Sequence, residues 1–66
     1  MDTKKIAVVV DNDGLSLSIT SIFLSEELGF LTFSFAYPTV GWSFIKEQRV
    51  KGRNVDLLIS NMICEN

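Results

Sequence analysis

The spacing of apolar residues differs between segments of the chain, and each spacing predicts a type of secondary structure. Residues 6–10, IAVVV, are uninterrupted apolar, which is typical of a strand covered on both faces. Residues 31–36, LTFSFA, alternate with period two, which predicts an edge strand with one apolar and one polar face. A short apolar stretch at residues 55–60 predicts a third strand.

Helical spacing follows the first strand. Asp13 suits the N-cap of a helix that ends at Gly29, where a left-handed helix end favours glycine. One apolar row at the i, i+4, i+7, i+8 spacing predicts the buried face of this helix, namely Leu15, Ile19, Ile22 and Phe23. A second row widens that face, namely Leu17, Leu24 and Leu28.

A second helix is expected over residues 39–50, between Pro38 and Gly52, with Val40, Phe44 and Ile45 toward the sheet. The order β-α-β-α-β predicts an α/β fold with parallel strands and right-handed crossovers. No linker divides the chain, so residues 1–66 are expected to form one domain. Trp42, near the start of this helix, is expected in or partly in the core rather than as a surface anchor.

Composition narrows the class of protein. With 66 residues, 47% of them hydrophobic and five of them Phe, the chain is expected to form one small globular core. Eight acids against six bases provide no general basic field for nucleic acid or an anionic membrane, and the bases of residues 46–53 are expected to face solvent. The single Cys64 excludes an intramolecular disulfide, and the lack of histidine argues against structural zinc; a small apolar role at a strand end is expected for Cys64.

The lengths of the apolar runs also indicate whether the chain carries a targeting signal. The apolar run after Lys4 and Lys5 is too short for a signal peptide, and no stretch reaches the roughly 20 apolar residues of a membrane span. An intracellular location and no membrane partner are therefore expected.

Candidate chemistry lies at the strand ends. Asp11 and Asp13 follow the first strand and Asn61 follows the third. Ligands of open parallel sheets bind at the carboxyl ends of the strands, so these oxygen-bearing side chains converge if the two strands are neighbours. Such a cluster suits Mg²⁺. Asp13 equally suits the helix cap, and Asp11 equally suits a solvated acid at a strand end.

The order of elements, VVVDND on the first strand and VDLLISN on the third, resembles the receiver domain of two-component response regulators, particularly those of plants. The resemblance implies a flavodoxin-like three-layer sandwich with strand order 2-1-3, of which this chain matches the first three of five βα units. In that family an acidic pair binds magnesium, and an aspartate after the third strand accepts a phosphoryl group. By position, Asp11 and Asn12 match the pair and Asn61 matches the phosphoacceptor.

Both departures from the family replace an acid by an amide. An amide cannot neutralise a dication or attack phosphorus as an anion. The resemblance therefore implies a degenerate receiver, or pseudo-receiver, that is not an enzyme and requires no cofactor, with only weak Mg²⁺ binding through Asp11, Asn12 and Asp13. It would act in phosphorelay signalling or transcription regulation through contacts with signalling proteins, such as a phosphotransfer protein or another receiver. The plant likeness implies the nucleus.

Two other functions compete with this interpretation. VVVDNDG also resembles the first motif of haloacid-dehalogenase-type phosphatases, with Asp11 as nucleophile, Asp13 as general acid and base, and Ser60 binding phosphate. Leu15 departs from that motif, and the helix leaves no room for the family's flap. An EF-hand is excluded because Val9 and Thr20 stand where the loop needs oxygen ligands.

The second competing function is that of an interaction module. In this interpretation the third strand is an open edge of the sheet that pairs with another chain or a second copy.

Overall fold

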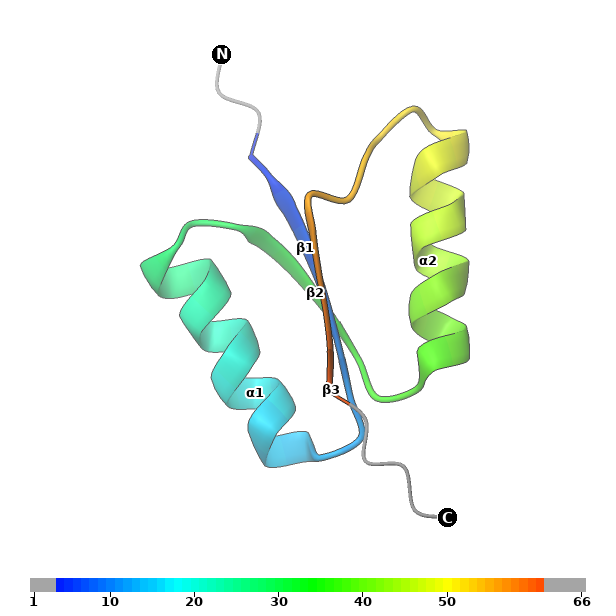
Figure 1. Ribbon diagram of the computed structural model, residues 1–66. Coiled ribbons are helices and arrows are strands. Elements are labelled where there is room, and N and C mark those ends of the chain that lie inside the picture. Colours follow the sequence, from blue (N-terminus) through cyan, green and yellow to red (C-terminus); the bar gives the residue numbers. More distant parts are fainter. Residues whose placement is uncertain (1–3, 62–66) are drawn as a thin grey trace.

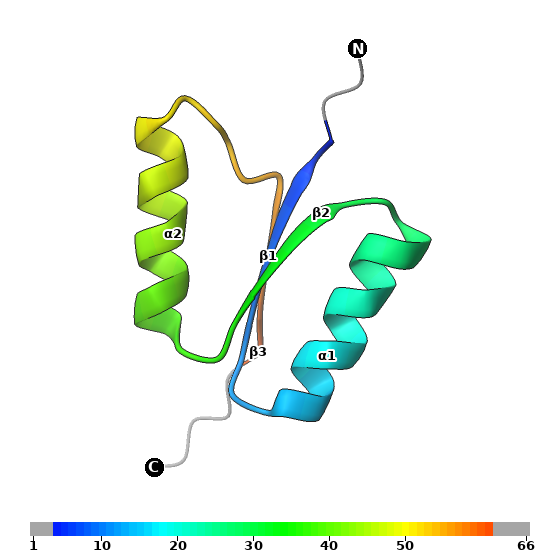
Figure 2. The same ribbon diagram turned by 180° about the vertical axis from the view of Figure 1, so that it is seen from behind.

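The three strands form one parallel sheet between two helical layers (Figure 1; Figure 2). The computed structural model describes residues 4–61. Their order is β1 (Ile6–Asp11), α1 (Gly14–Ile22), η1 (Phe23–Glu27), β2 (Leu31–Phe35), α2 (Pro38–Val50) and β3 (Leu57–Asn61). The strands lie in the order β2-β1-β3, all parallel, which confirms the predicted strand order and the edge position of β2.

β1 is the central strand and is buried along its whole length. Ala7 and Val9 pack with Leu24 on the α1 side of the sheet. Val8 and Val10 alternate with them and so face the α2 side. Because helices cover both faces, no position of residues 6–10 can expose a polar side chain, which explains the uninterrupted apolar run.

The face that α1 buries differs from the predicted one. The row expected in the core is exposed: Leu15, Ile19, Ile22 and Phe23. The second row is inward only in part, since Leu24 is buried and Leu17 half-buried, whereas Leu28 is exposed. Ser21 lies on the inner face and its hydroxyl bonds to that of Ser34 on β2. The polar face of β2 therefore packs against the side of the helix that carries Ser21.

The helix ends in a π-helical turn, η1, rather than as a regular α-helix up to Gly29. The Leu28 amide donates to the carbonyl of Phe23 at 3.3 Å, five residues back. The hydroxyl of Ser25 donates to the Ser21 carbonyl at 2.7 Å, and such back-bonding competes with the regular helical pattern. Gly29 then takes the predicted left-handed conformation, with φ of 74°.

α2 packs on the other face through aromatic contacts. The ring of Phe44 lies 4.5 Å from that of Phe33 and 5.3 Å from that of Phe35, as centroid distances, which confirms that Phe44 faces the sheet. The predictions for two neighbours are wrong: Val40 is exposed, and Trp42 is 56% exposed. Both residues flank Gly41, which is the buried residue of that turn and the one that faces Val10 of β1.

The bases of residues 46–53 are exposed as predicted. β3 starts at Leu57 instead of residue 55, because Asp56 bonds to the start of β1: its carboxylate accepts the Ile6 amide at 2.8 Å, and its own amide donates to the Ile6 carbonyl at 2.9 Å. Within the described part of the chain, no helix has the length and apolar character needed to cross a membrane. Cys64 lies outside the described residues.

Candidate functional site

The candidate site lies at the carboxyl edge of the sheet, where β1 and β3 end together. Asp11 and Asn61 are paired in the β1–β3 register. The Asn61 side-chain amide, Nδ2, donates to Asp11 Oδ2 at 3.3 Å. The two strands are therefore neighbours, and the structure brings these two predicted site residues into contact.

Asp11 is buried, with 3% of its surface exposed, so the interpretation as a solvated acid is wrong. Its second oxygen, Oδ1, accepts the backbone amide of Asp13 at 2.9 Å. Both oxygens thus accept a hydrogen bond, which is what a buried carboxylate needs to offset the loss of water. The bond to Asp13 also closes the turn between β1 and α1.

Asp13 is the N-cap of α1, as predicted. Its backbone is extended, with φ of −97° and ψ of 111°. Its Oδ1 accepts the Leu15 amide at 3.2 Å, and its Oδ2 accepts the Ser16 hydroxyl at 3.0 Å. Both carboxylate oxygens therefore serve the first turn of the helix.

Two of the three residues expected to bind Mg²⁺ weakly, Asp11 and Asp13, already accept hydrogen bonds. Asn12 is exposed, Asp13 caps the helix, and Asp11 is a single carboxylate whose oxygens already accept two hydrogen bonds. Among residues 4–61, no three acidic or cysteine side chains gather closely enough to hold a metal ion. Weak Mg²⁺ binding at this edge therefore stays a prediction.

The charge of Asp11 is compensated by dipoles. In the described chain the ion pair is Lys51–Glu47, at 3.1 Å on the surface of α2, so no described cation lies within ion-pair distance of Asp11. The Asn61 amide and the Asp13 N–H supply the positive ends of dipoles instead. An aspartate at position 61 would bring two carboxylates together at this point.

Ser60, which the phosphatase interpretation needs beside Asp11, lies on the other face of β3. Successive residues of a strand point to opposite faces, and Ser60 pairs with Val10 while Asn61 pairs with Asp11. Ser60 instead lines a hollow of about 90 Å³ with Trp42 and Leu58. The structure does not bring Ser60 together with the two aspartates.

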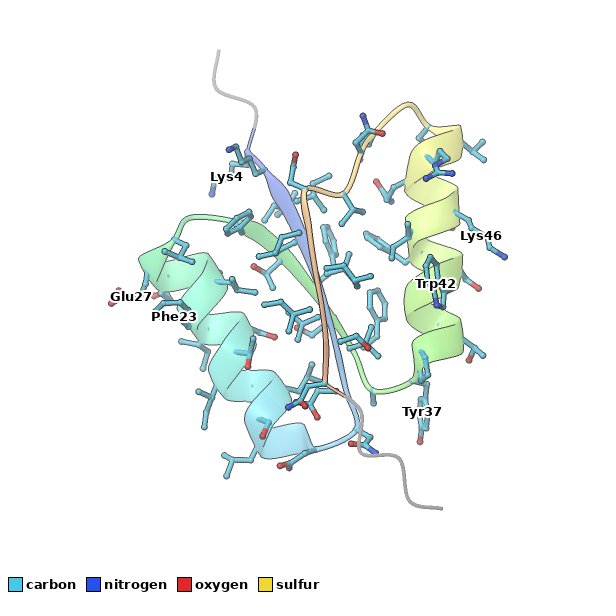
Figure 3. All side chains as sticks on the ribbon, in the orientation of Figure 1. Lys4, Phe23, Glu27, Tyr37, Trp42 and Lys46 are labelled. Carbon is cyan, nitrogen blue, oxygen red and sulfur yellow. The ribbon has the colours of Figure 1, made fainter. Side chains whose placement is uncertain are left out.

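An exposed apolar row on α1 was missed as a functional candidate, because the same spacing that places it on one face also suits a core. This row, the α1 stripe, consists of Leu15, Ile19, Ile22 and Phe23, each more than half exposed. In Figure 3, Phe23 and Glu27 point away from the sheet. Residues 11–30 contain four acids and no base, and three of these acids, Asp13, Glu26 and Glu27, are exposed.

At the site itself, the arrangement of Asp11, Asp13 and Asn61 closes a turn, caps a helix and ties two strand ends. Among residues 4–61, the two carboxylates at this edge, those of Asp11 and Asp13, each accept two hydrogen bonds. Comparison with family models, with curated proteins and with solved structures finds no match for this chain.

Proposed function

We propose that this chain is a degenerate receiver-like domain of flavodoxin type, which acts in phosphorelay signalling or transcription regulation through protein contacts and not through phosphorylation. The strand order β2-β1-β3 with helices on both faces supports the fold part of the proposal. The contact between the ends of β1 and β3 supports the site part, because the family's pocket requires those ends to be adjacent.

The observation that supports the proposal most directly is the hydrogen bond from Asn61 Nδ2 to Asp11 Oδ2. A receiver with aspartate at both positions relies on a cation to hold the two carboxylates together. Here the amide donates to the carboxylate, so the edge is stable without a cation. The same amide removes the nucleophile that phosphorylation needs.

The α1 stripe is the surface that we propose for contacts with a partner protein. Its four side chains are each more than half exposed, and an apolar patch of this kind on a monomer is often functional. Three exposed acids, Asp13, Glu26 and Glu27, lie in the same segment of the chain, which contains no base. The partner surface that fits is therefore apolar with flanking lysine or arginine, on a signalling protein such as a phosphotransfer protein.

The test is a Mg²⁺ titration of the wild type and of the double variant Asn12→Asp and Asn61→Asp, followed by NMR at the amides of residues 11–13 and 61. We expect no saturable binding by the wild type and saturable binding by the double variant, because the variant restores two carboxylates beside Asp11. Acetyl phosphate added with Mg²⁺ should leave the wild type unmodified.

The matched control is Val50→Asp with Asn54→Asp, which adds the same charge at exposed positions near the other end of α2. Equal Mg²⁺ binding by the control variant would contradict a specific pocket. Hydrolysis of acetyl phosphate by the wild type, lost in Asp11→Asn, would contradict the proposal and favour the phosphatase.

A further inference from the structure

A second candidate site lies at the amino edge of the sheet, opposite the carboxyl edge that holds Asp11. There the start of β1 and the loop after α2 border a hollow of about 590 Å³. Its lining includes three bases, one amide and two apolar side chains: Lys4, Lys5, Arg53, Asn54, Ile6 and Leu31. Figure 3 shows Lys4 at this end of the molecule, beside the start of β1.

Folding brings these bases together from distant parts of the chain. Lys5 is tied to the sheet because its carbonyl accepts the Leu31 amide at 2.8 Å. Arg53 is tied to α2 because its amide donates to the Gln48 carbonyl at 2.9 Å. The backbone on both sides of the hollow is thus anchored, and the long side chains extend from fixed points.

The charge of the hollow is positive. Among residues 4–61, Asp56 is the one acidic residue that lines it, and Asp56 Oδ2 already accepts the Ile6 amide at 2.8 Å. Within residues 4–61 the ion pair is Lys51–Glu47, so Lys4, Lys5 and Arg53 have no described carboxylate within ion-pair distance. The opposite edge of the sheet carries Asp11 and Asp13, so the molecule separates its charge along the strands.

We propose that this hollow binds a small organic phosphate, with the phosphate group on Arg53, Lys4 and Lys5. The planar guanidinium of Arg53 matches two phosphate oxygens, and the ammonium groups supply further charge. Ile6 and Leu31 form an apolar surface for the organic part of the ligand. The volume of the hollow lies within the range of small-ligand sites.

The experiment is an NMR titration of the full chain with adenosine monophosphate and, separately, with adenosine, at physiological salt. We expect saturable shifts of the Ile6, Arg53 and Asn54 amides with the phosphate and binding about tenfold or more weaker with the nucleoside, because charge-assisted hydrogen bonds are lost. Saturation by both ligands at equal concentration, or no saturable shift, would overturn the proposal.

Two variants with the same change of charge distinguish binding at a specific site from attraction by net charge. Arg53→Gln and Lys46→Gln each remove one positive charge, but only Arg53 lines the hollow, whereas Lys46 points outward from α2 (Figure 3). We expect Arg53→Gln to weaken binding about tenfold and Lys46→Gln to change it less than about twofold. Equal weakening by the two variants would show attraction by net charge alone and would overturn the site. The result is independent of Mg²⁺ binding at Asp11, which lies at the other edge.

Discussion

Asp11 and Asp13 follow the same strand, yet their carboxylates bond to different parts of the structure. Asp11 is buried and accepts from the Asp13 amide and the Asn61 side chain. Asp13 is exposed and accepts from the Leu15 amide and the Ser16 hydroxyl. The difference arises because the chain turns between them: residue 11 still belongs to the sheet, and residue 13 already belongs to the helix end.

Asp13→Ala should lower the free energy of unfolding by about 1 kcal/mol, because it removes the acceptor for a helix N–H that has no other partner. Urea denaturation followed by circular dichroism measures the loss. Asn12→Ala is the matched control, since Asn12 is the exposed residue beside it. Equal losses in both variants would contradict a specific cap.

On the level of elements, helix burial is decided by the surface of the sheet that each helix meets. α1 faces a side of β2 that carries Thr32 and Ser34, and it turns Ser21 toward them. α2 faces the phenylalanines of β2 and turns Phe44 toward them. The apolar residues that do not meet the sheet remain exposed and form the α1 stripe.

Gly41 permits α2 to approach β1 closely. A Cβ atom at Gly41 would lie 2.8 Å from Cγ2 of Val10, a fully packed residue of the central strand. Gly41→Ala should therefore lower the free energy of unfolding by about 1–2 kcal/mol, since overpacking outweighs the better helix propensity of alanine.

Gly14→Ala is the control for this prediction, because a Cβ at Gly14 would meet nothing within 4 Å. Thermal and urea denaturation of both variants should show a loss for Gly41→Ala and no loss for Gly14→Ala. A gain in stability for Gly41→Ala would show that the helix moves away from β1 at no cost.

For the molecule as a whole, β3 is one edge of the sheet, and no strand among residues 4–61 pairs with its outer side. Its residues, LLISN, contain no charge and no proline, two features that natural edge strands use against pairing. Apolar side chains flank the edge on both faces, with Leu58 beside the hollow at Trp42 and with Leu57 and Ile59 on the α1 side. Because β3 is uncharged, two antiparallel copies can pair without like-charge repulsion.

We expect the chain to self-associate through β3 into a dimer at micromolar to millimolar concentration. Leu58→Lys should shift the protein to the monomer, as measured by analytical ultracentrifugation, because it places a charge beside the paired edge. Leu31→Lys is the control at the other edge strand, where the exposed fraction is 45% against 44% for Leu58. Dissociation by the control, or a monomer at every concentration, would contradict pairing through β3.

Much of the fold followed from local patterns. The three strands, the Asp13 cap and the left-handed conformation of Gly29 agree with the structure, and the strand order agrees with the one that the receiver resemblance implied. Of the site, the proximity of Asp11 and Asn61 was predicted through the order of the strands. The burial of Asp11 and the exposure of Trp42 were not predicted. Burial depends on the residues that cover a side chain in space, and a linear pattern does not show them.

The sequence by itself determined the order and the approximate positions of the strands and α-helices, because hydrophobic period, caps and glycine act within a few residues of the chain. It also determined the lack of an acid at position 61. Only the tertiary structure decided which face of α1 is buried, that Asn61 donates to a buried Asp11, and that Lys4 and Lys5 join Arg53 around one hollow. Those features arise between segments far apart in the chain, where packing and charge depend on distances in space.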